Sequence, residues 1–104
     1  MEIPVIDVDT LASRLDAGVP VFDVRQPDEY EQARAPGVRL VPLDQVPDRL
    51  DEFPTEGEVY VICRSGGRSA KAVEFLRGNG VDAVNVAGGT LAWIESGKPV
   101  ETGV

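Results

Sequence analysis

Short apolar runs rich in β-branched residues alternate along this chain with segments in which apolar residues recur at helical spacing. Runs of this composition are typical of strands that are buried on both faces. Five such runs, each four to six residues long, lie at Ile3–Ile6, Val19–Val24, Val38–Val41, Glu58–Ile62 and Ala83–Val86.

The segments between these runs predict helices. The clearest helix covers Arg68–Arg77 and is stopped by Gly78-Asn79-Gly80. Its apolar side is expected to hold Ala72, Val73, Phe75 and Leu76. Shorter helices are expected after a candidate N-cap at Asp7, from Pro27, over Asp44–Leu50 and over Thr90–Ser96.

Strands that alternate with helices in this way form βαβ units. The pattern therefore predicts an α/β fold, with a five-stranded, mainly parallel sheet flanked by helices on both faces. Ligands of such sheets bind where the strands end. Cys63 follows the best-defined strand and precedes the clearest helix, so its position alone makes it a candidate functional residue.

The chain has 104 residues, of which 42% are hydrophobic and 27% are charged, as in an ordinary globular protein. This length predicts one domain over residues 1–104. Its apolar runs are far shorter than the roughly 20 residues of a membrane span. Its first residues carry acids where a signal peptide carries basic residues. We therefore expect a cytoplasmic protein, with a monomer as the default state.

Acidic residues outnumber basic ones by 18 to 10, which gives a net charge of −8. A surface of this sign repels nucleic acids and anionic membranes, so we expect neither as a partner. The chain has no histidine, and Cys63 is its one cysteine. This excludes an internal disulfide, a Cys/His metal site, a Cys–His pair and a Ser–His–Asp triad.

The segment from Cys63 to Ser69 joins the best strand to the clearest helix and contains Gly66 and Gly67. Glycine permits backbone conformations in which successive N–H groups point into one concavity. The free N–H groups and the positive dipole end of the following helix face the same place. Because both effects stabilise an anion, the sequence predicts a reactive Cys63 thiol with a lowered pKa.

The charges near this loop differ from those of the rest of the chain. Residues 59–73 include no acidic residue but three basic ones, Arg64, Arg68 and Lys71. A basic segment in an acidic protein favours a small anionic substrate that binds locally. The alternative is that Cys63 is a small buried hydrophobe and that the arginines are merely solvated. The two glycines and the basic segment together favour the functional interpretation.

A cysteine-dependent phosphatase or arsenate reductase is a second chemistry for such a loop. In cysteine phosphatases one more residue separates the cysteine from the arginine. Here four residues separate Cys63 from Arg68, and Ser69 stands where the longer spacing requires arginine. The smaller loop suits a cysteine persulfide better than a phosphocysteine, so we disfavour this alternative.

Four groups of residues occur together and in a familiar order. They are Phe22-Asp23-Val24-Arg25 with Glu29-Tyr30; Pro36-Gly37 with Val41-Pro42-Leu43; Val61-Ile62-Cys63-Arg64-Ser65-Gly66-Gly67-Arg68-Ser69; and Val86-Ala87-Gly88-Gly89 with Ala92-Trp93 and Gly97-Lys98-Pro99-Val100. In these motifs the chain resembles the rhodanese family of sulfurtransferases in its single-domain form, over roughly Asp7 to Val100.

The resemblance implies a thiosulfate sulfurtransferase with a ping-pong reaction at Cys63 and no cofactor. The thiolate takes the outer sulfur of thiosulfate, or of a similar small anionic donor, and becomes a persulfide as sulfite leaves. An acceptor then removes this sulfur. Cyanide is the laboratory acceptor, and a thiol or a protein thiol is expected in a cell.

In the family, backbone N–H groups of the loop hold the persulfide. Carried over to this chain, these substrate-binding positions are Arg64, Ser65, Gly66, Gly67, Arg68 and Ser69. The guanidinium groups of Arg68 and Arg64 are expected to attract the anionic donor. The hydroxyl of Ser69 either donates to the sulfur or caps the helix, and we prefer the cap.

The remaining motif residues are expected to have structural roles. Arg25 and Glu29 are predicted to form an ion pair, and Asp23 to hold a loop near the site. Gly88-Gly89 is predicted to form a tight turn into the last helix at the edge of the pocket. Trp93 is predicted to be a core residue, on an apolar side that it shares with Leu91 and Ile94.

The chain departs from the family at Ala33-Arg34-Ala35, where the family commonly has Gly-His-Ile. In the family this histidine is not the base for the cysteine, so the departure affects the local turn rather than the chemistry. A further alternative is a persulfide carrier or interaction module that partner proteins load and unload. In either case the lack of a second cysteine means that an outside acceptor must take the sulfur.

Overall fold

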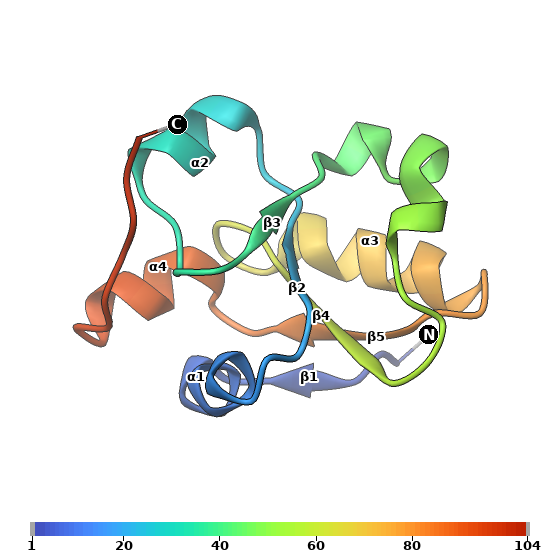
Figure 1. The fold of residues 1–104 in the computed structure, drawn as a ribbon, viewed down its shortest axis with the longest axis horizontal. Coiled ribbons are helices and arrows are strands. Elements are labelled where there is room, and N and C mark those ends of the chain that lie inside the picture. The colour runs from blue at the N-terminus through green and yellow to red at the C-terminus, as the bar shows by residue number, and fades with distance from the viewer. Residues whose placement is uncertain (1, 104) are drawn as a thin grey trace.

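All five predicted strands are present, and they form one parallel sheet (Figure 1). The computed structural model describes residues 2–103. The sheet order is β1-β5-β4-β2-β3, so β4 lies at the centre. The strands are β1 (Val5–Ile6), β2 (Val21–Asp23), β3 (Arg39–Leu40), β4 (Glu58–Ile62) and β5 (Asp82–Val86).

The predicted helices are also present. Asp7 is the N-cap of the first one, because its carboxylate accepts the N–H of Thr10 at 2.8 Å. The α-helices are α1 (Val8–Asp16), α2 (Pro27–Gln32), α3 (Gly67–Arg77) and α4 (Gly89–Glu95).

The helix expected over Asp44–Leu50 differs from the prediction. It consists of two 3₁₀ helices, η1 (Leu43–Gln45) and η2 (Pro47–Glu52). Pro47 has no N–H to continue the bonds of the preceding turn. The dihedral angles of Arg49 also leave the helical region. This segment therefore bends over the sheet instead of forming one straight helix.

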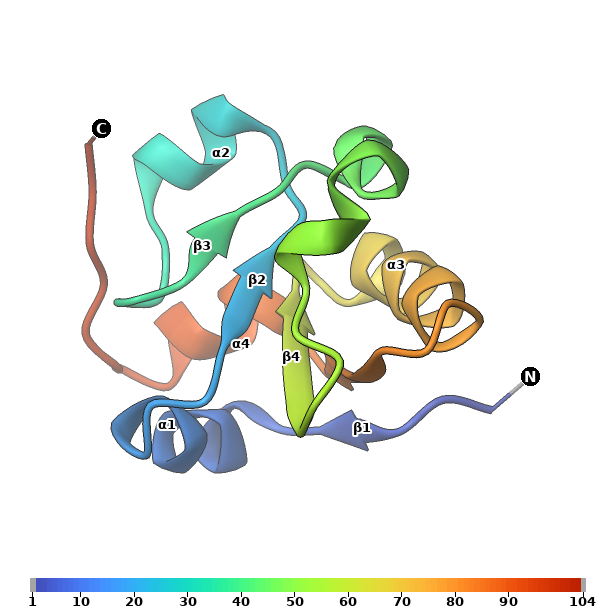
Figure 2. The ribbon, with the colours of Figure 1, turned by 45° about the vertical axis from the view of Figure 1, so that its right-hand side comes forward.

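The side chains of the central strand alternate between two hydrophobic cores, one on each face of the sheet. Val59, Val61 and Cys63 pack on the face covered by α3 and the two 3₁₀ helices. Tyr60 and Ile62 pack on the opposite face, which α1 and α4 cover (Figure 2). The prediction of helices on both faces of a parallel sheet is therefore confirmed.

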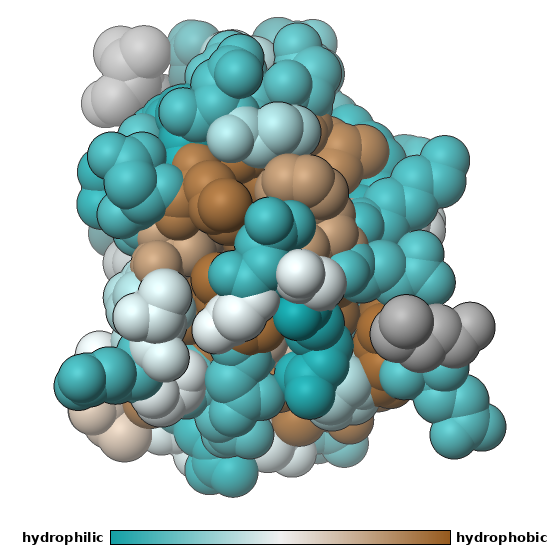
Figure 3. All heavy atoms as spheres, turned by 90° about the vertical axis from the view of Figure 1, so that its right-hand side faces the viewer, coloured by the Kyte–Doolittle hydropathy of each residue, from teal (hydrophilic) through white to brown (hydrophobic). Residues whose placement is uncertain are grey.

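One residue of the predicted apolar side of α3 is not in the core. Ala72, Val73 and Leu76 are fully buried, whereas Phe75 is 38% exposed. A helix of this length on a sheet buries a narrow stripe, and position 75 lies at its margin. Figure 3, which faces the side on the right in Figure 1, shows apolar surface between hydrophilic side chains.

The carboxyl ends of β2 and β4 meet at one edge of the sheet, where Asp23 pairs with Ile62. Cys63 follows β4 at this edge. Helices α2 and α4 lie at the same end of the molecule, on the left in Figure 1. The fold thus places the Cys63 loop between the start of α3 and the two short helices.

Candidate active site

The loop after β4 turns sharply into α3 at Gly66. This residue is the N-cap of α3 and has φ of +114°, a conformation that favours glycine. Its carbonyl accepts the N–H of Ala70 at 3.1 Å, which begins the bonding pattern of the helix. The loop from Cys63 therefore reaches the helix N-terminus within a few residues, as its glycines predict.

The sulfur of Cys63 is buried at the centre of this loop, since the residue is only 1% exposed. The N–H of Gly66 donates to Sγ at 3.1 Å, and Oγ of Ser69 lies 3.3 Å from it. Burial raises the pKa of Cys63, but the Ser69 hydroxyl and the N–H groups of Ser69, Gly66 and Ser65 outweigh it. The pKa of the thiol is therefore lowered, and the site favours the thiolate.

The loop does not turn all its N–H groups toward the sulfur. Among residues 2–103, no hydrogen bond to Sγ comes from the N–H of Arg64, Gly67 or Arg68. The side chains of Arg64 and Ser65 are exposed, and that of Ser69 is fully buried. The donors thus come from Gly66, at the turn, and from Ser69, in the first turn of α3.

Ser69 does not have the role we preferred for it. No side chain caps the start of α3. The Ser69 hydroxyl instead lies against the sulfur and 2.5 Å from Oδ1 of Asn85. Because Ser69 is in the third position of α3, its side chain points back toward the loop rather than to the free N–H groups.

The predicted ion pair between Arg25 and Glu29 is wrong. Arg25 is buried and pairs with Asp23, with 2.7 Å between Nη2 and Oδ2. From Glu29 it reaches only the backbone carbonyl. Asp23 also accepts the N–H of Arg25, and Arg25 donates to the Ala33 carbonyl at 2.8 Å, so the pair holds the turn after β2.

Glu29 pairs instead with Arg68, which lies 39 residues further along the chain. The two nitrogens Nη1 and Nη2 reach the two carboxylate oxygens at 2.6 and 2.8 Å. The hydrogen bond from Arg68 lowers the pKa of Glu29 to about 2. The pair joins α2 to the start of α3 and largely neutralises the charge of Arg68.

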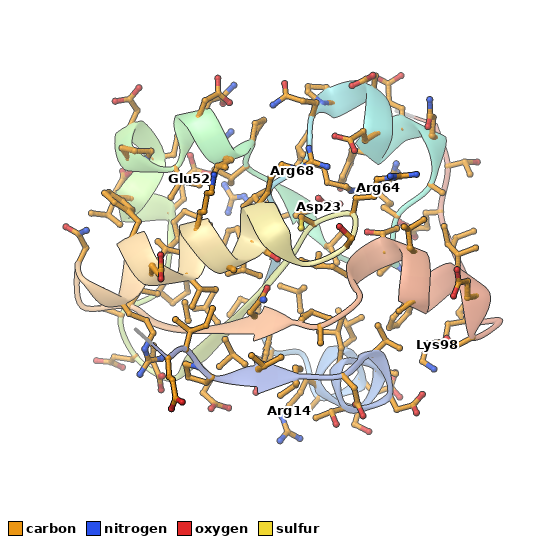
Figure 4. The ribbon with its side chains drawn as sticks, turned by 180° about the vertical axis from the view of Figure 1, so that it is seen from behind. Arg14, Asp23, Glu52, Arg64, Arg68 and Lys98 are labelled. Atoms are coloured by element: carbon orange, nitrogen blue, oxygen red, sulfur yellow. The ribbon has the colours of Figure 1, made fainter. Side chains whose placement is uncertain are left out.

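Arg64 is the arginine of this loop whose charge is not compensated. Its side chain is exposed and has no hydrogen bond or ion pair to any residue in the range 2–103. It lines a hollow of about 250 Å³, which α2 and α4 border through Gln32, Leu91 and Ile94. Figure 4 shows Arg64 in this position, with Arg68 at the start of α3.

The turn of Gly88-Gly89 fastens α4 to the Cys63 loop. The N–H of Thr90 donates to the carbonyl of Cys63 at 2.8 Å, and the N–H of Leu91 to that of Arg64 at 3.0 Å. A Cβ atom on Gly89 would lie 2.4 Å from the Cys63 carbonyl oxygen. The tight turn beside the site is therefore confirmed, and only glycine allows this close approach.

These features make Cys63 a candidate nucleophile in an anion-stabilising loop. The match to known proteins agrees with this description, because a model of the rhodanese-like domain matches residues 7–96.

The chain belongs to the rhodanese-like domain family.

Some relatives of this rhodanese-like chain match it over nearly their whole length, whereas it spans about half of others. A sulfurtransferase of Allochromatium vinosum is 36% identical over 91% of this chain and 92% of its own. A putative sulfurtransferase of Bacillus subtilis is 31% identical over 95% and 98%. The crystal structure of a rhodanese-like domain protein from Staphylococcus aureus is 38% identical, with a TM-score of 0.87, over 98% and 100%. Family membership and the buried Cys63 fit sulfur transfer.

Where this rhodanese-like domain departs from the family motif, Arg34 fills the turn after α2. Its guanidinium lies 4.3 Å from the centre of the Tyr30 ring and donates to the carbonyls of Tyr30 and Gly103. Its backbone pairs with Glu101. Arg34 thus ties the C-terminal segment to α2.

The prediction that Trp93 is a core residue of α4 is confirmed, but the prediction that Leu91 and Ile94 share its apolar side is wrong. Trp93 is buried, and its indole N–H donates to the Pro99 carbonyl at 2.7 Å. Leu91 and Ile94 are 37% and 44% exposed and line the hollow beside Arg64. They lie on a different face of the helix from Trp93, because neither is three or four residues away from it.

Sequence reasoning missed Asn85 and Thr90. Both side chains are buried and contact the Cys63 loop directly. Asn85 is the one polar residue in the inner part of β5, between Val84 and Val86. A lone amide in a buried strand was a usable signal, because such a group needs hydrogen-bond partners.

Two further results concern the described range of the chain as a whole. Residues 2–103 contain no cluster of three or more histidine, cysteine or acidic side chains that could hold a metal ion. Within the same range, no helix has the length and apolar character needed to cross a membrane.

Proposed function

We propose that this protein is a thiosulfate-type sulfurtransferase that carries the transferred sulfur as a persulfide on Cys63. The observation that carries this proposal is the environment of the sulfur. Cys63 Sγ is buried, accepts the N–H of Gly66 and lies against the hydroxyl of Ser69. Such a site stabilises an anionic sulfur without a metal or a histidine.

In the first half-reaction the Cys63 thiolate attacks the outer sulfur of thiosulfate. A bond forms between Sγ and this sulfur, and the sulfur–sulfur bond of thiosulfate breaks. The electron pair of that bond leaves with sulfite. The product is a Cys63 persulfide anion, and the loop donors that lower the pKa of the thiol are suited to hold its negative charge.

In the second half-reaction an acceptor nucleophile attacks the outer sulfur of the persulfide. Cyanide leaves as thiocyanate, and a thiol leaves as its own persulfide. The electron pair of the broken bond returns to Sγ and regenerates the thiolate. Because Cys63 is the one cysteine of the chain, no internal thiol competes for the sulfur.

The donor anion is expected to contact Arg64 rather than Arg68. The charge of Arg68 is taken up by Glu29, whereas Arg64 is free at the mouth of the hollow. A free guanidinium beside a nucleophile attracts dianions such as thiosulfate. Arg68 keeps a share of this role, because its charge and that of a Cys63 thiolate stabilise each other.

A persulfide carrier is the second candidate. One relative, 36% identical over 88% of this chain and 51% of its own length, is a putative sulfur carrier protein of Bacillus subtilis. Exposed Leu91 and Ile94 beside Arg64 are the surface that a partner protein would contact. A carrier would receive its sulfur from another protein and react poorly with small donors. For either function we expect a single cytoplasmic domain that acts as a monomer.

The deciding experiment is the intact mass of the protein after incubation with thiosulfate and again after addition of cyanide. We expect a gain of one sulfur atom that cyanide removes with formation of thiocyanate. Cys63→Ser is the control and should gain no sulfur, although its fold is retained. If the wild-type protein gains no sulfur from thiosulfate but gains it from a protein persulfide, the protein is a carrier and not a thiosulfate sulfurtransferase.

A further inference from the structure

Asn85 lies behind the Cys63 loop and has no role in the reaction described above. Its side chain is buried, with the residue only 7% exposed. It is paired in register with Val61, two residues before Cys63 on the neighbouring strand. Its flanking residues Val84 and Val86 face the opposite core. The amide of Asn85 therefore points to the same side of the sheet as the nucleophile.

Both ends of this amide are used within the loop. Nδ2 donates to the carbonyl of Gly66 at 3.3 Å, and Oδ1 accepts the hydroxyl of Ser69 at 2.5 Å. In the reverse orientation Oδ1 would face the oxygen of the Gly66 carbonyl, and two acceptors cannot form a hydrogen bond. The contacts therefore fix the orientation of the amide.

The hydroxyl of Ser69 has one proton and three acceptors within reach. These are Oδ1 of Asn85 at 2.5 Å, the Gly66 carbonyl at 3.2 Å and Sγ of Cys63 at 3.3 Å. One hydroxyl cannot donate fully to more than one of them. Ser69 is fully buried, so water does not supply another donor. The acceptors therefore compete for the proton.

We propose that Asn85 is a positioning residue for sulfur transfer. The Ser69 hydroxyl donates its hydrogen bond to Asn85 while Cys63 is neutral, and to the sulfur when Cys63 is anionic. This proposal rests on the proposed function in one respect, namely that the Cys63 sulfur is the reacting atom. A hydrogen bond to a charged acceptor is about twice as strong as one between neutral groups. The proton consequently moves by rotation of the hydroxyl, and no other atom needs to move.

This competition has a direction that can be measured. With Asn85 present, ionising Cys63 sacrifices a short hydrogen bond between Ser69 and Asn85. Removing that acceptor costs the protein with a neutral Cys63 thiol a hydrogen bond, whereas the protein with a Cys63 thiolate did not use this bond. Removing Oδ1 should therefore lower the pKa of Cys63, by about 0.5–1 for one neutral hydrogen bond. Removing the Ser69 hydroxyl should raise it, because the thiolate then loses a donor.

The charged groups near the sulfur are the same in all these variants. They are Arg68 of α3 with its partner Glu29 of α2, Arg64 of the loop, and the pair of Asp23 and Arg25 after β2. None contacts the amide of Asn85. The carbonyl of Gly66 also keeps its bond from Ala70 when Asn85 is replaced.

The test is a double-mutant cycle read by the ultraviolet absorbance of the thiolate as a function of pH. The chain suits this measurement because Cys63 is its one cysteine, and Cys63→Ser supplies the blank. The variants are Asn85→Leu, Ser69→Ala and the combination of both. We expect Asn85→Leu to lower the pKa, Ser69→Ala to raise it, and the double variant to match Ser69→Ala.

An Asn85→Leu protein with an unchanged or raised pKa would overturn the proposal. So would a change of the same size with and without Ser69, since a purely structural role of Asn85 does not require the hydroxyl. Asn85→Ala removes the same acceptor with a smaller side chain and serves if Asn85→Leu does not fold. The titration needs no sulfur donor, so its outcome is separate from that of the mass experiment.

Discussion

Two hollows lie at opposite ends of the sheet, and the larger one is away from the nucleophile. It has a volume of about 660 Å³ and lies where β2 and β3 begin, beside Pro20, Pro36 and Trp93. The smaller one, of about 250 Å³, lies where the strands end, beside Arg64 and the Cys63 loop. The two sites differ in chemistry as well as in size.

The basic charge of the larger hollow, on Lys98, is paired within the molecule. Lys98 contacts Asp9 and lies 5.8 Å from the centre of the Trp93 ring. The smaller hollow has the free charge of Arg64, and the adjacent loop holds a sulfur that accepts the N–H of Gly66 and lies against the Ser69 hydroxyl. The comparison teaches that free N–H groups at strand ends and helix starts, rather than volume, give this fold its chemistry.

The largest effect should come from adding a methyl group at the turn beside the loop. Gly89 has φ of +56°, and a Cβ atom there would lie 2.4 Å from the Cys63 carbonyl oxygen and 2.6 Å from that of Arg64. Gly89→Ala must displace the loop. We expect a loss of about 2–4 kcal/mol in the free energy of unfolding and of about 100-fold in kcat/KM. Urea denaturation and thiosulfate–cyanide kinetics measure the two.

Gly18→Ala is the matched control at the larger hollow. Gly18 has φ of +79°, but no atom lies within 4 Å of the position that a Cβ atom would take there. The free energy of unfolding should fall only by roughly 1–2 kcal/mol, the cost of the left-handed conformation for alanine, and kcat/KM should be unchanged. If the two variants lost activity equally, the special role of the loop end would be refuted.

The second effect concerns the free charge. Arg64→Glu reverses the sign at the smaller hollow, and Asp16→Arg makes the opposite change at the larger one. Losing a charge-assisted contact of about 1.5–3 kcal/mol should raise KM for thiosulfate at least about 10-fold in Arg64→Glu. Asp16→Arg should leave KM unchanged. A fall in KM for Asp16→Arg that matches the rise for Arg64→Glu would point to the overall charge of the protein instead.

The smallest effect concerns the pair of Glu29 and Arg68 and is a matter of pH. The pKa of Glu29 is held at about 2, below the value of about 4.3 in an unfolded chain. Its contribution to stability is therefore present above about pH 4.5 and lost as the pH falls toward 2. Both side chains are partly exposed, so we expect about 1 kcal/mol from this pair at pH 7.

Urea denaturation of wild type and Glu29→Gln at several pH values checks this expectation. The difference between the two proteins should be largest at neutral pH and should vanish near pH 2. A difference that stays constant over this range would mean that Glu29 acts through packing rather than through its charge.

The strands and helices could be predicted because each leaves a local pattern. Glu58–Ile62 is a β-branched run, and Gly66 and Gly67 mark the turn into α3. The order of the strands in the sheet leaves no local pattern. Strand β4 lies between β5 and β2, and this order depends on which way each connection crosses the sheet. The bend at Pro47 also separated two 3₁₀ helices that apolar spacing presents as one.

The place of Cys63 between a strand end and a helix start was predictable for the same reason, but its neighbours were only partly so. Cys63 and its glycines are contiguous in sequence. The partner of Arg68 is 39 residues away, and Glu29 was assigned instead to Arg25, which is nearer in sequence. Nearness in sequence favours a local pair only on a helix, whereas Arg25 precedes α2 and turns back to Asp23.

The hydrogen bonds of Thr90 and Leu91 have one more consequence, for the size of the anion that the loop encloses. They hold the carbonyls of Cys63 and Arg64, and the helical bond to Ala70 holds that of Gly66. Between these fixed points only Ser65 is left to adjust. A loop fastened so closely cannot widen as a ligand enters. We therefore expect the number of residues in the loop to set its diameter, so that fitting a larger anion would require an insertion rather than a substitution.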